Sequence, residues 1–127
     1  MSEAADQFIS DHEVKYADVA SGTDSGSLTL LDIRRPDELK DTGFIPGSRN
    51  LPLQDLDEAL SLDPAEFHAR YGFAKPQPAD QLTITCRSGR RVKLSVPVFT
   101  KHGYTNLKLY LGSFLDWQEH GGQVCKM

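Results

Sequence analysis

The stretch at residues 82–92 constrains the fold most strongly, because within it a strand pattern gives way to a tight turn. Residues 82–85 (LTIT) are mostly branched side chains, which suit a buried strand. Gly89 ends that pattern, and the segment that follows, closed by His102 and Gly103, is long for a strand. We therefore predict a strand, a turn and a helix in succession.

Further strand and helix patterns alternate along the chain. Residues 28–33 (LTLLDI) form a near-continuous apolar run, which is typical of a strand in a parallel sheet covered on both faces. We predict shorter strands at residues 49–51 and 106–110, and helices at residues 14–20, 36–42, 52–60, 64–71, 90–101 and 113–120. A parallel sheet needs a crossover after residue 89, which favours a helix there although Pro97 lies inside it. The alternation predicts an α/β domain around a mainly parallel sheet with helices on both faces.

The length of the chain fits one domain. A chain of 127 residues that is 39% hydrophobic and 25% charged has an ordinary globular composition and can bury a core without metal or disulfide support. We expect residues 1–12 to be a flexible acidic arm, residues 13–120 to form the domain, and residues 121–127 to be a polar tail.

Charge and composition argue against several classes of partner. The net charge of −4 gives no support for binding to nucleic acid or to an anionic membrane, and no apolar run approaches the roughly 20 residues that span a bilayer. The acidic first dozen residues contain no Arg, unlike an import presequence. Two cysteines are too few for a disulfide framework, which favours a reducing compartment. A soluble, cytoplasmic protein is the expectation.

No metal or cofactor site is expected from the sequence. The four histidines show no ligand spacing among themselves or with the cysteines: His12, His68, His102 and His120. Cys125 lies in the polar tail, where an idle cysteine is the simpler interpretation and a resolving thiol is the alternative.

The turn after residue 85 carries the candidate chemistry, with Cys86 as the nucleophile. A free cysteine thiol has a pKa of about 8.5, so only a minority is thiolate at neutral pH. Positive charge on Arg87, Arg90 and Arg91, converging backbone N–H groups and the N-terminus of the following helix all favour the anion, and the same groups bind an oxyanion. Gly89 allows the sharp turn. The alternative is a small buried core cysteine followed by a solvated helix start, which the density of arginines disfavours.

Ligands of such sheets bind beyond the carboxyl ends of the strands, where both Cys86 and Asp32 fall. Asp32 and Arg34 either orient the loop from the neighbouring strand or have a structural role only. Ser88 is either a donor to the oxygens of a substrate or a small residue that the turn allows.

Several separated motifs resemble those of one known family. The loop CRSGRR at residues 86–91 resembles the active-site loop of the rhodanese (thiosulfate sulfurtransferase) family, particularly its single-domain members. The motifs LDIR at residues 31–34 with Glu38, GFIPGS at 43–48 and NLP at 50–52 resemble the two upstream signatures of the family, in the same order. Gly103-Tyr104 and residues 112–117 resemble its C-terminal signatures. The resemblance covers residues 13–119.

This resemblance implies a five-stranded parallel sheet and a two-step reaction. Cys86 would attack the outer sulfur of thiosulfate or a similar donor, release sulfite and become a persulfide, without a cofactor. A thiophile would then take the sulfur, and members of this type are associated with glutathione, cyanide or a protein thiol as acceptor. Arg87 and Arg91 are expected to stabilise the displaced dianion, and Asp32 and Arg34 to form an ion pair behind the loop.

The sequence departs from the family pattern at three positions. Phe44 stands where many relatives have His, and Ser113 where a second Gly is common. We expect neither to affect catalysis, because neither lies in the loop. Pro97 predicts a kinked or locally unwound helix, since an interior proline removes a hydrogen bond and costs about 3 kcal/mol in a regular helix.

Two other functions use the same kind of fold. A phosphatase or arsenate reductase needs five residues between the cysteine and the arginine, whereas four separate Cys86 from Arg91, and the cysteine follows Thr85 where those enzymes commonly have His. A non-catalytic rhodanese-like module that binds a protein would typically lack the cysteine or the basic loop, and this chain has both. A sulfurtransferase therefore remains the preferred hypothesis.

Overall fold

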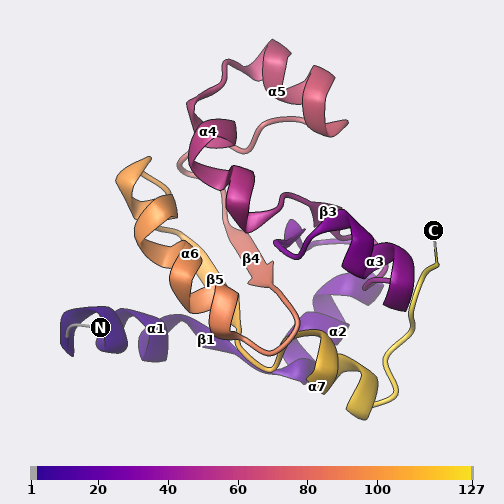
Figure 1. Ribbon diagram of the computed structural model, residues 1–127. Coiled ribbons are helices and arrows are strands. Elements are labelled where there is room, and N and C mark those ends of the chain that lie inside the picture. Colours follow the sequence, from indigo (N-terminus) through magenta and orange to yellow (C-terminus); the bar gives the residue numbers. More distant parts are fainter. Residues whose placement is uncertain (1–2, 127) are drawn as a thin grey trace.

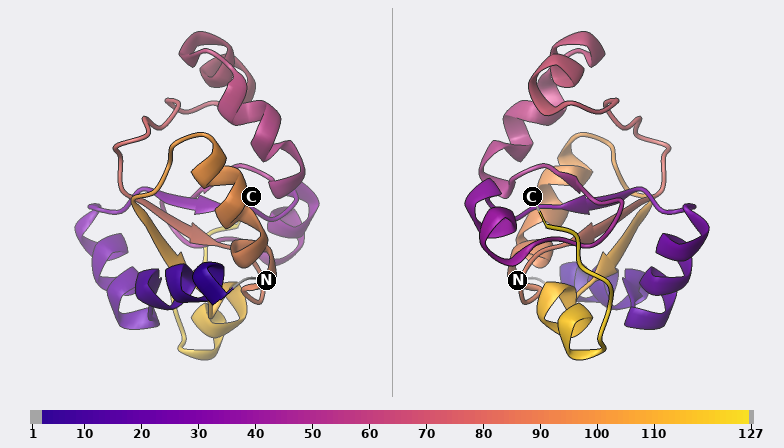
Figure 2. Two further views of the ribbon diagram at one scale, coloured as in Figure 1. Left: turned by 90° about the vertical axis from the view of Figure 1, so that its left-hand side faces the viewer. Right: turned by 90° about the vertical axis from the view of Figure 1, so that its right-hand side faces the viewer.

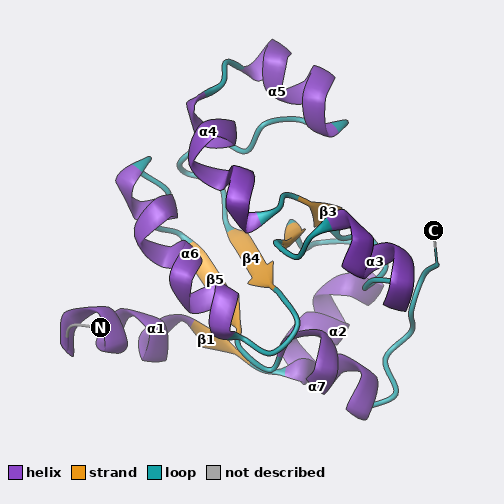
Figure 3. Cartoon of the chain, viewed as in Figure 1, coloured by secondary structure: helices purple, strands orange, loops and turns teal. Residues whose placement is uncertain are grey.

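The protein is built on one parallel β-sheet, as the sequence predicts. The structure, a computed structural model, describes residues 3–126. Five strands pair in parallel in the order β1-β5-β4-β2-β3 (Figure 1, Figure 3). The strands are β1 (Glu13–Val14), β2 (Leu30–Asp32), β3 (Arg49–Asn50), β4 (Leu82–Thr85) and β5 (Leu107–Tyr110). The predicted α/β class and the five-stranded sheet are confirmed.

Helices cover both faces of this sheet (Figure 2). They are α1 (Glu3–His12), α2 (Tyr16–Ser25), α3 (Pro36–Thr42), a 3₁₀ turn (Leu53–Asp55), α4 (Leu56–Ser61), α5 (Pro64–Tyr71), α6 (Arg90–Lys101) and α7 (Ser113–Glu119). The larger part of the core lies between the sheet and helices α1, α4, α5 and α6. A smaller cluster packs α2 and α7 against the opposite face.

The register of the sheet places two polar strand ends beside each other. Asp32 is the register partner of Thr85, so β2 and β4 end at the same level. Every residue of β2 and β4 is buried, as expected for central strands of a parallel sheet that is covered on both faces. Cys86 therefore emerges from the middle strand of the sheet at the carboxyl edge, one residue beyond the level of Asp32.

Helices with local start and stop signals form where the sequence predicts them. α3 has Pro36 in its first turn and ends at Gly43, and the Asp63 carboxylate accepts a hydrogen bond from the N–H of Glu66 at the start of α5. α6 is helical throughout, including Pro97, so of the two alternatives predicted there, a kink or local unwinding, the unwinding is wrong. Pro97 is exposed, and the carbonyl group of Lys93 that loses its helical partner also belongs to an exposed residue.

The N-terminal arm is an ordered helix, which corrects the flexible arm predicted for residues 1–12; residues 1 and 2 lie outside the described part. α1 buries Ile9 in the main core, and the rings of Phe8 and His12 stack with their centroids 3.9 Å apart. The burial of Ile9 against the rest of the fold and the ring stack within the helix, rather than a sequence repeat, stabilise α1.

Residues 13–33 also differ from the prediction of a helix at residues 14–20 followed by a strand at residues 28–33. Val14 belongs to the edge strand β1, which pairs with β5, instead of opening a helix. The helix that follows continues through Gly22 and ends only at Gly26. A Cβ atom at residue 22 would collide with the side chain of Leu28, so this glycine allows close packing and does not terminate the helix. The predicted strand at residues 28–33 is shortened to its central three residues.

The C-terminal segment packs back onto the domain. Phe44 and Cys125 form an antiparallel bridge with two backbone hydrogen bonds of 2.9 Å, and the Trp117 indole N–H donates to the carbonyl of Gln123. Cys125 is thus held next to the end of α3 with its thiol unpaired. Met127 lies outside the described residues.

Within residues 3–126, no helix has the length and apolar character needed to cross a membrane. The same residues contain no cluster of three or more His, Cys, Asp or Glu side chains that is suited to holding a metal ion.

Candidate active site

Cys86 lies buried at the end of the central strand and begins a tight loop. Its exposed fraction is 1%, and the backbone N–H of Gly89 donates to its Sγ atom over 3.1 Å. Gly89 has φ = 95°, in the left-handed region, and a Cβ atom there would collide with the carbonyl oxygen of Leu111. Only glycine satisfies both conditions. The loop therefore closes directly over the sulfur, and α6 begins at the next residue, Arg90.

The backbone of this loop presents hydrogen-bond donors. The carbonyl oxygens of Cys86 and Arg87 accept the N–H groups of Phe114 and Leu115 in α7, over 3.0 and 3.1 Å. Within the described part of the chain, the N–H groups of Arg87, Ser88 and Arg90 have no acceptor. The loop thus has two carbonyl groups occupied by α7 and three N–H groups without an acceptor, at the N-terminus of a twelve-residue helix. Such an arrangement stabilises an anion.

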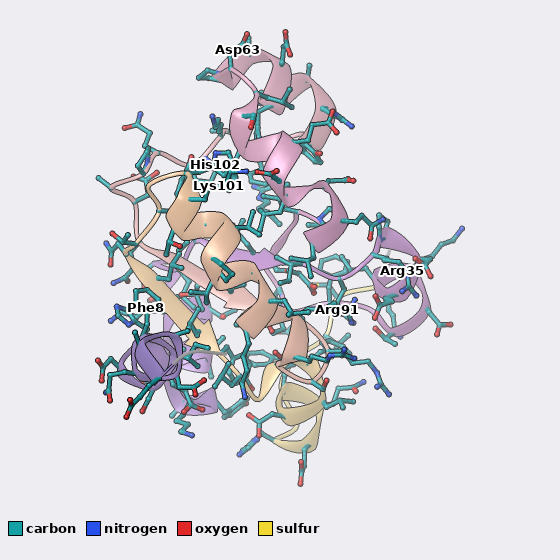
Figure 4. All side chains as sticks on the ribbon, turned by 60° about the vertical axis from the view of Figure 1, so that its left-hand side comes forward. Phe8, Arg35, Asp63, Arg91, Lys101 and His102 are labelled. Carbon is teal, nitrogen blue, oxygen red and sulfur yellow. The ribbon has the colours of Figure 1, made fainter. Side chains whose placement is uncertain are left out.

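The three arginines of the loop differ in their surroundings. Arg91 forms a bidentate ion pair with Glu38 of α3, with N–O distances of 2.6 and 2.9 Å, and Figure 4 shows it on α6, facing the helix at whose start Arg35 is labelled. The hydrogen bonds from Arg91 lower the pKa of Glu38 to about 2, and Glu38 in turn raises the pKa of Arg91. Arg87 and Arg90 are exposed and, among the described residues, have no ion-pair partner. They are the loop cations available to a substrate.

Asp32 and Arg34 form the ion pair that the family resemblance implies. Both side chains are at most 1% exposed, and the guanidinium holds both carboxylate oxygens over 2.8 to 3.1 Å. Arg34 also donates to the Thr42 hydroxyl and the Gly43 carbonyl at the end of α3, and its guanidinium carbon lies 4.3 Å from the centroid of the Phe114 ring. The pair therefore joins β2, α3 and α7 behind the loop.

Ser113 is the site residue that the sequence analysis missed. Its side chain is fully buried, its Oγ accepts the backbone N–H of Cys86 over 3.1 Å, and it lies 3.7 Å from the sulfur. The expectation that a change at position 113 has no bearing on the site is not supported by this geometry. The only signal in the sequence was the departure from glycine at this position, because α7 is 27 residues away from the cysteine along the chain. Ser88, by contrast, is exposed in the loop.

A buried thiol under free N–H groups, flanked by exposed arginines on a parallel α/β sheet, defines the class of cysteine-loop transferases and hydrolases. Comparison with known proteins identifies the family within this class. Residues 15–120 match the family model described as "Rhodanese-like domain". The chain belongs to the rhodanese family.

Several members of this family are closely similar to the chain. The thiosulfate:glutathione sulfurtransferase of Saccharomyces cerevisiae is 40% identical over 101 residues, which cover 80% of this chain and 72% of the relative. The thiosulfate sulfurtransferase RDL2, mitochondrial, of the same yeast is 37% identical over 97 residues, covering 76% and 64%. The solved structure of the human single-domain sulfurtransferase TSTD1 superposes with a TM-score of 0.79 at 33% identity, covering 85% of this chain and 96% of that one.

Proposed function

We propose that the protein is a thiosulfate sulfurtransferase that carries sulfane sulfur on Cys86 and delivers it to a thiol, with glutathione as the small-molecule acceptor. One observation carries the proposal: the buried Cys86 sulfur accepts the Gly89 N–H in a loop where, among the described residues, the N–H groups of three residues and the side chains of Arg87 and Arg90 have no partner. Membership of a family whose members include thiosulfate:glutathione sulfurtransferases supports the choice of substrates.

In the first step the Cys86 thiolate attacks the outer sulfur of thiosulfate. A sulfur–sulfur bond forms to Cys86, the bond between the two thiosulfate sulfurs breaks, and its electron pair leaves with sulfite. The thiolate and the thiosulfate dianion become a persulfide anion and a sulfite dianion, so charge is conserved. The exposed Arg87 and Arg90 stabilise the dianion that enters and leaves, because guanidinium groups bind tetrahedral oxyanions through paired hydrogen bonds.

In the second step a thiolate acceptor attacks the terminal sulfur of the persulfide. Cys86 leaves as a thiolate, and the acceptor becomes a persulfide anion. The N–H of Gly89 and the free N–H groups of the loop stabilise the anion, whether it is the Cys86 thiolate or the persulfide. The loop therefore assists both the transfer of sulfur to Cys86 and its transfer from Cys86 to the acceptor. This route uses no metal and no organic cofactor. A protein thiol is a second acceptor class consistent with the same chemistry.

Steady-state assays with thiosulfate and glutathione test this proposal. We expect sulfite release by the native protein and by Cys125→Ser, and none above background by Cys86→Ser. The two single replacements remove one thiol each from a chain that has two, so they are matched controls. If turnover persists in Cys86→Ser, or if it is lost in Cys125→Ser and not in Cys86→Ser, Cys86 is not the residue that carries the sulfur. Hydrolysis of a generic aryl phosphate above the Cys86→Ser background would favour the phosphatase alternative instead.

We further propose a cytoplasmic location, because the two unpaired cysteines favour a reducing compartment. The name of the yeast relative RDL2 places that protein in mitochondria. Microscopy of the chain with a C-terminal fluorescent tag distinguishes the two locations, and a mitochondrial signal would contradict the proposal.

A further inference from the structure

Ser113 holds an unusual backbone conformation directly beside the nucleophile. Its φ angle is 57°, the one positive φ of a non-glycine residue in the described part of the chain. This left-handed conformation is unfavourable for a residue with a Cβ atom and costs glycine little. The protein thus keeps a serine where a glycine would fit with less strain, which indicates that the hydroxyl contributes something a glycine lacks.

The hydroxyl makes three contacts at once. Its oxygen lies 3.1 Å from the Cys86 nitrogen, 2.8 Å from the Tyr110 carbonyl oxygen and 3.7 Å from the Cys86 sulfur. The first contact uses an oxygen lone pair, because the Cys86 N–H is the donor. The other two compete for the single hydroxyl proton, since a serine donates one hydrogen bond.

The charge on the sulfur decides which of these two acceptors receives the proton. A neutral carbonyl at 2.8 Å is the better acceptor while Cys86 is a thiol. Once the sulfur is anionic, a charge-assisted hydrogen bond to it is roughly twice as strong as a neutral one, and both Cys86 and Ser113 are at most 1% exposed. Rotation about the Cβ–Oγ bond then suffices to redirect the proton.

We propose that Ser113 is a positioning residue that anchors the backbone of Cys86 and turns its hydroxyl proton to the sulfur when that sulfur becomes an anion. The thiolate part of this proposal is independent of the substrate, and its extension to the persulfide rests on the proposed function. Together with the Gly89 N–H, the hydroxyl gives the sulfur donors from two different elements, the loop and α7.

The charged groups around the loop do not occupy this hydroxyl. Arg91 of α6 interacts with the charge of Cys86 while it is paired with Glu38 of α3. Asp116 of α7 accepts the hydroxyl of Tyr110 over 2.7 Å, and the ion pair of Asp32 and Arg34 lies behind the loop. Within the described residues, the hydrogen bonds of the Ser113 side chain go only to Cys86 and Tyr110.

Titration of the Cys86 thiolate tests the proposal. In a Cys125→Ser background Cys86 is the remaining thiol, so the ultraviolet absorbance of the thiolate reports on it alone. We compare native Ser113 with Ser113→Gly, which retains access to the left-handed backbone, and with Ser113→Ala, which retains a Cβ atom. Both variants lack the hydroxyl. We expect the midpoint of the titration to move upward by about one pH unit in both, as for loss of a hydrogen bond to a charged group.

A merely structural role predicts a different result. It would change the denaturation midpoint and leave the titration of folded protein unmoved, and an unmoved midpoint in folded Ser113→Gly overturns the proposal. The rate of sulfite release by Ser113→Gly should fall about tenfold at neutral pH and recover at higher pH, as a shifted thiolate population requires. If the native protein releases no sulfite, the proposed function fails, and the thiolate titration still decides the role of Ser113.

Discussion

The neighbouring strands β2 and β4 both end in buried polar groups at the same edge of the sheet. The hydrogen-bond donors that follow β2 are paired within the protein, whereas several of those that follow β4 are not. After β2, the Arg34 guanidinium donates five hydrogen bonds inside the protein, to Asp32, Thr42 and Gly43. After β4, the loop of Cys86 has three N–H groups and two arginine side chains without a partner among residues 3–126. The first arrangement satisfies a buried charge within the fold, and the second leaves the capacity to bind an anion that comes from outside.

Because of this difference, we expect the residues after β2 to contribute mainly to the stability of the fold and the loop after β4 to contribute mainly to the reaction. A buried ion pair whose partners are fully hydrogen-bonded holds its elements together, and it loses much free energy when one partner is removed. Exposed cations contribute little to folding, but they attract a dianion and stabilise it where it reacts. We therefore expect substitutions in the two regions to affect different measurements.

Replacement of Arg34 should have the largest effect on stability. Arg34→Met leaves the Asp32 carboxylate buried without its partner, which typically costs about 3–5 kcal/mol. Arg35→Met is the matched control, because Arg35 is the next residue and pairs with Asp37 on the surface, where such pairs contribute little to stability. Urea denaturation measures both. Equal losses in the two variants would show that the buried pair does not brace the fold.

Replacement of the free loop arginines should affect the reaction and spare the fold. Arg87→Ala and Arg90→Ala each remove a cation without an ion-pair partner in the described residues, so stability should change by less than about 0.5 kcal/mol. The second-order rate with thiosulfate should fall about 10- to 100-fold, as for a hydrogen bond to a charged group. Arg70→Ala, an exposed change of the same charge on α5, is the control and should leave the rate unchanged. If Arg87→Ala and Arg90→Ala lost stability and kept the native rate, the loop arginines would have a structural role, contrary to our expectation.

Glu38 should show a smaller, pH-dependent effect. Arg91 lowers the pKa of Glu38 from 4.5 to about 2, so the ionised carboxylate stabilises the folded state above pH 4.5. This contribution is lost as the pH falls from 4.5 toward 2, where Glu38 becomes protonated in the folded state as well. Glu38→Gln should therefore be less stable than the native protein by about 1–2 kcal/mol at neutral pH, with the difference shrinking below pH 4.5.

Glu58→Gln serves as the control for this effect. Glu58 pairs with Arg70, and both side chains are substantially exposed, so its replacement should cost less than about 0.5 kcal/mol. Urea denaturation at a series of pH values measures the two variants. A Glu38→Gln difference that stays constant down to pH 2 would contradict the assigned ion pair.

The sequence predicted those parts of the molecule whose signals are local. The loop from Cys86 to Arg91 is contiguous, so its nucleophile, its glycine and its arginines could be identified together. Helices α3 and α5 begin at Pro36 and Pro64, and each ends at a glycine. Buried strands were visible as apolar runs.

The features that were missed depend on contacts between distant parts of the chain. The ion pair that holds Arg91 joins residues 53 positions apart, and no spacing in the sequence connects them. The two-residue strand β1 exists because it pairs with β5, and α1 because Ile9 packs into the core. Ser113 belongs to the site because α7 packs its first turn against the loop of Cys86.

Intact mass after brief treatment with thiosulfate tests the central claim most directly. The native protein and Cys125→Ser should each gain one sulfur atom, and glutathione should remove it with return to the original mass. Cys86→Ser should gain none. A native protein that gains no sulfur, or a Cys86→Ser variant that gains one, would contradict the assignment of Cys86 as the carrier of sulfur.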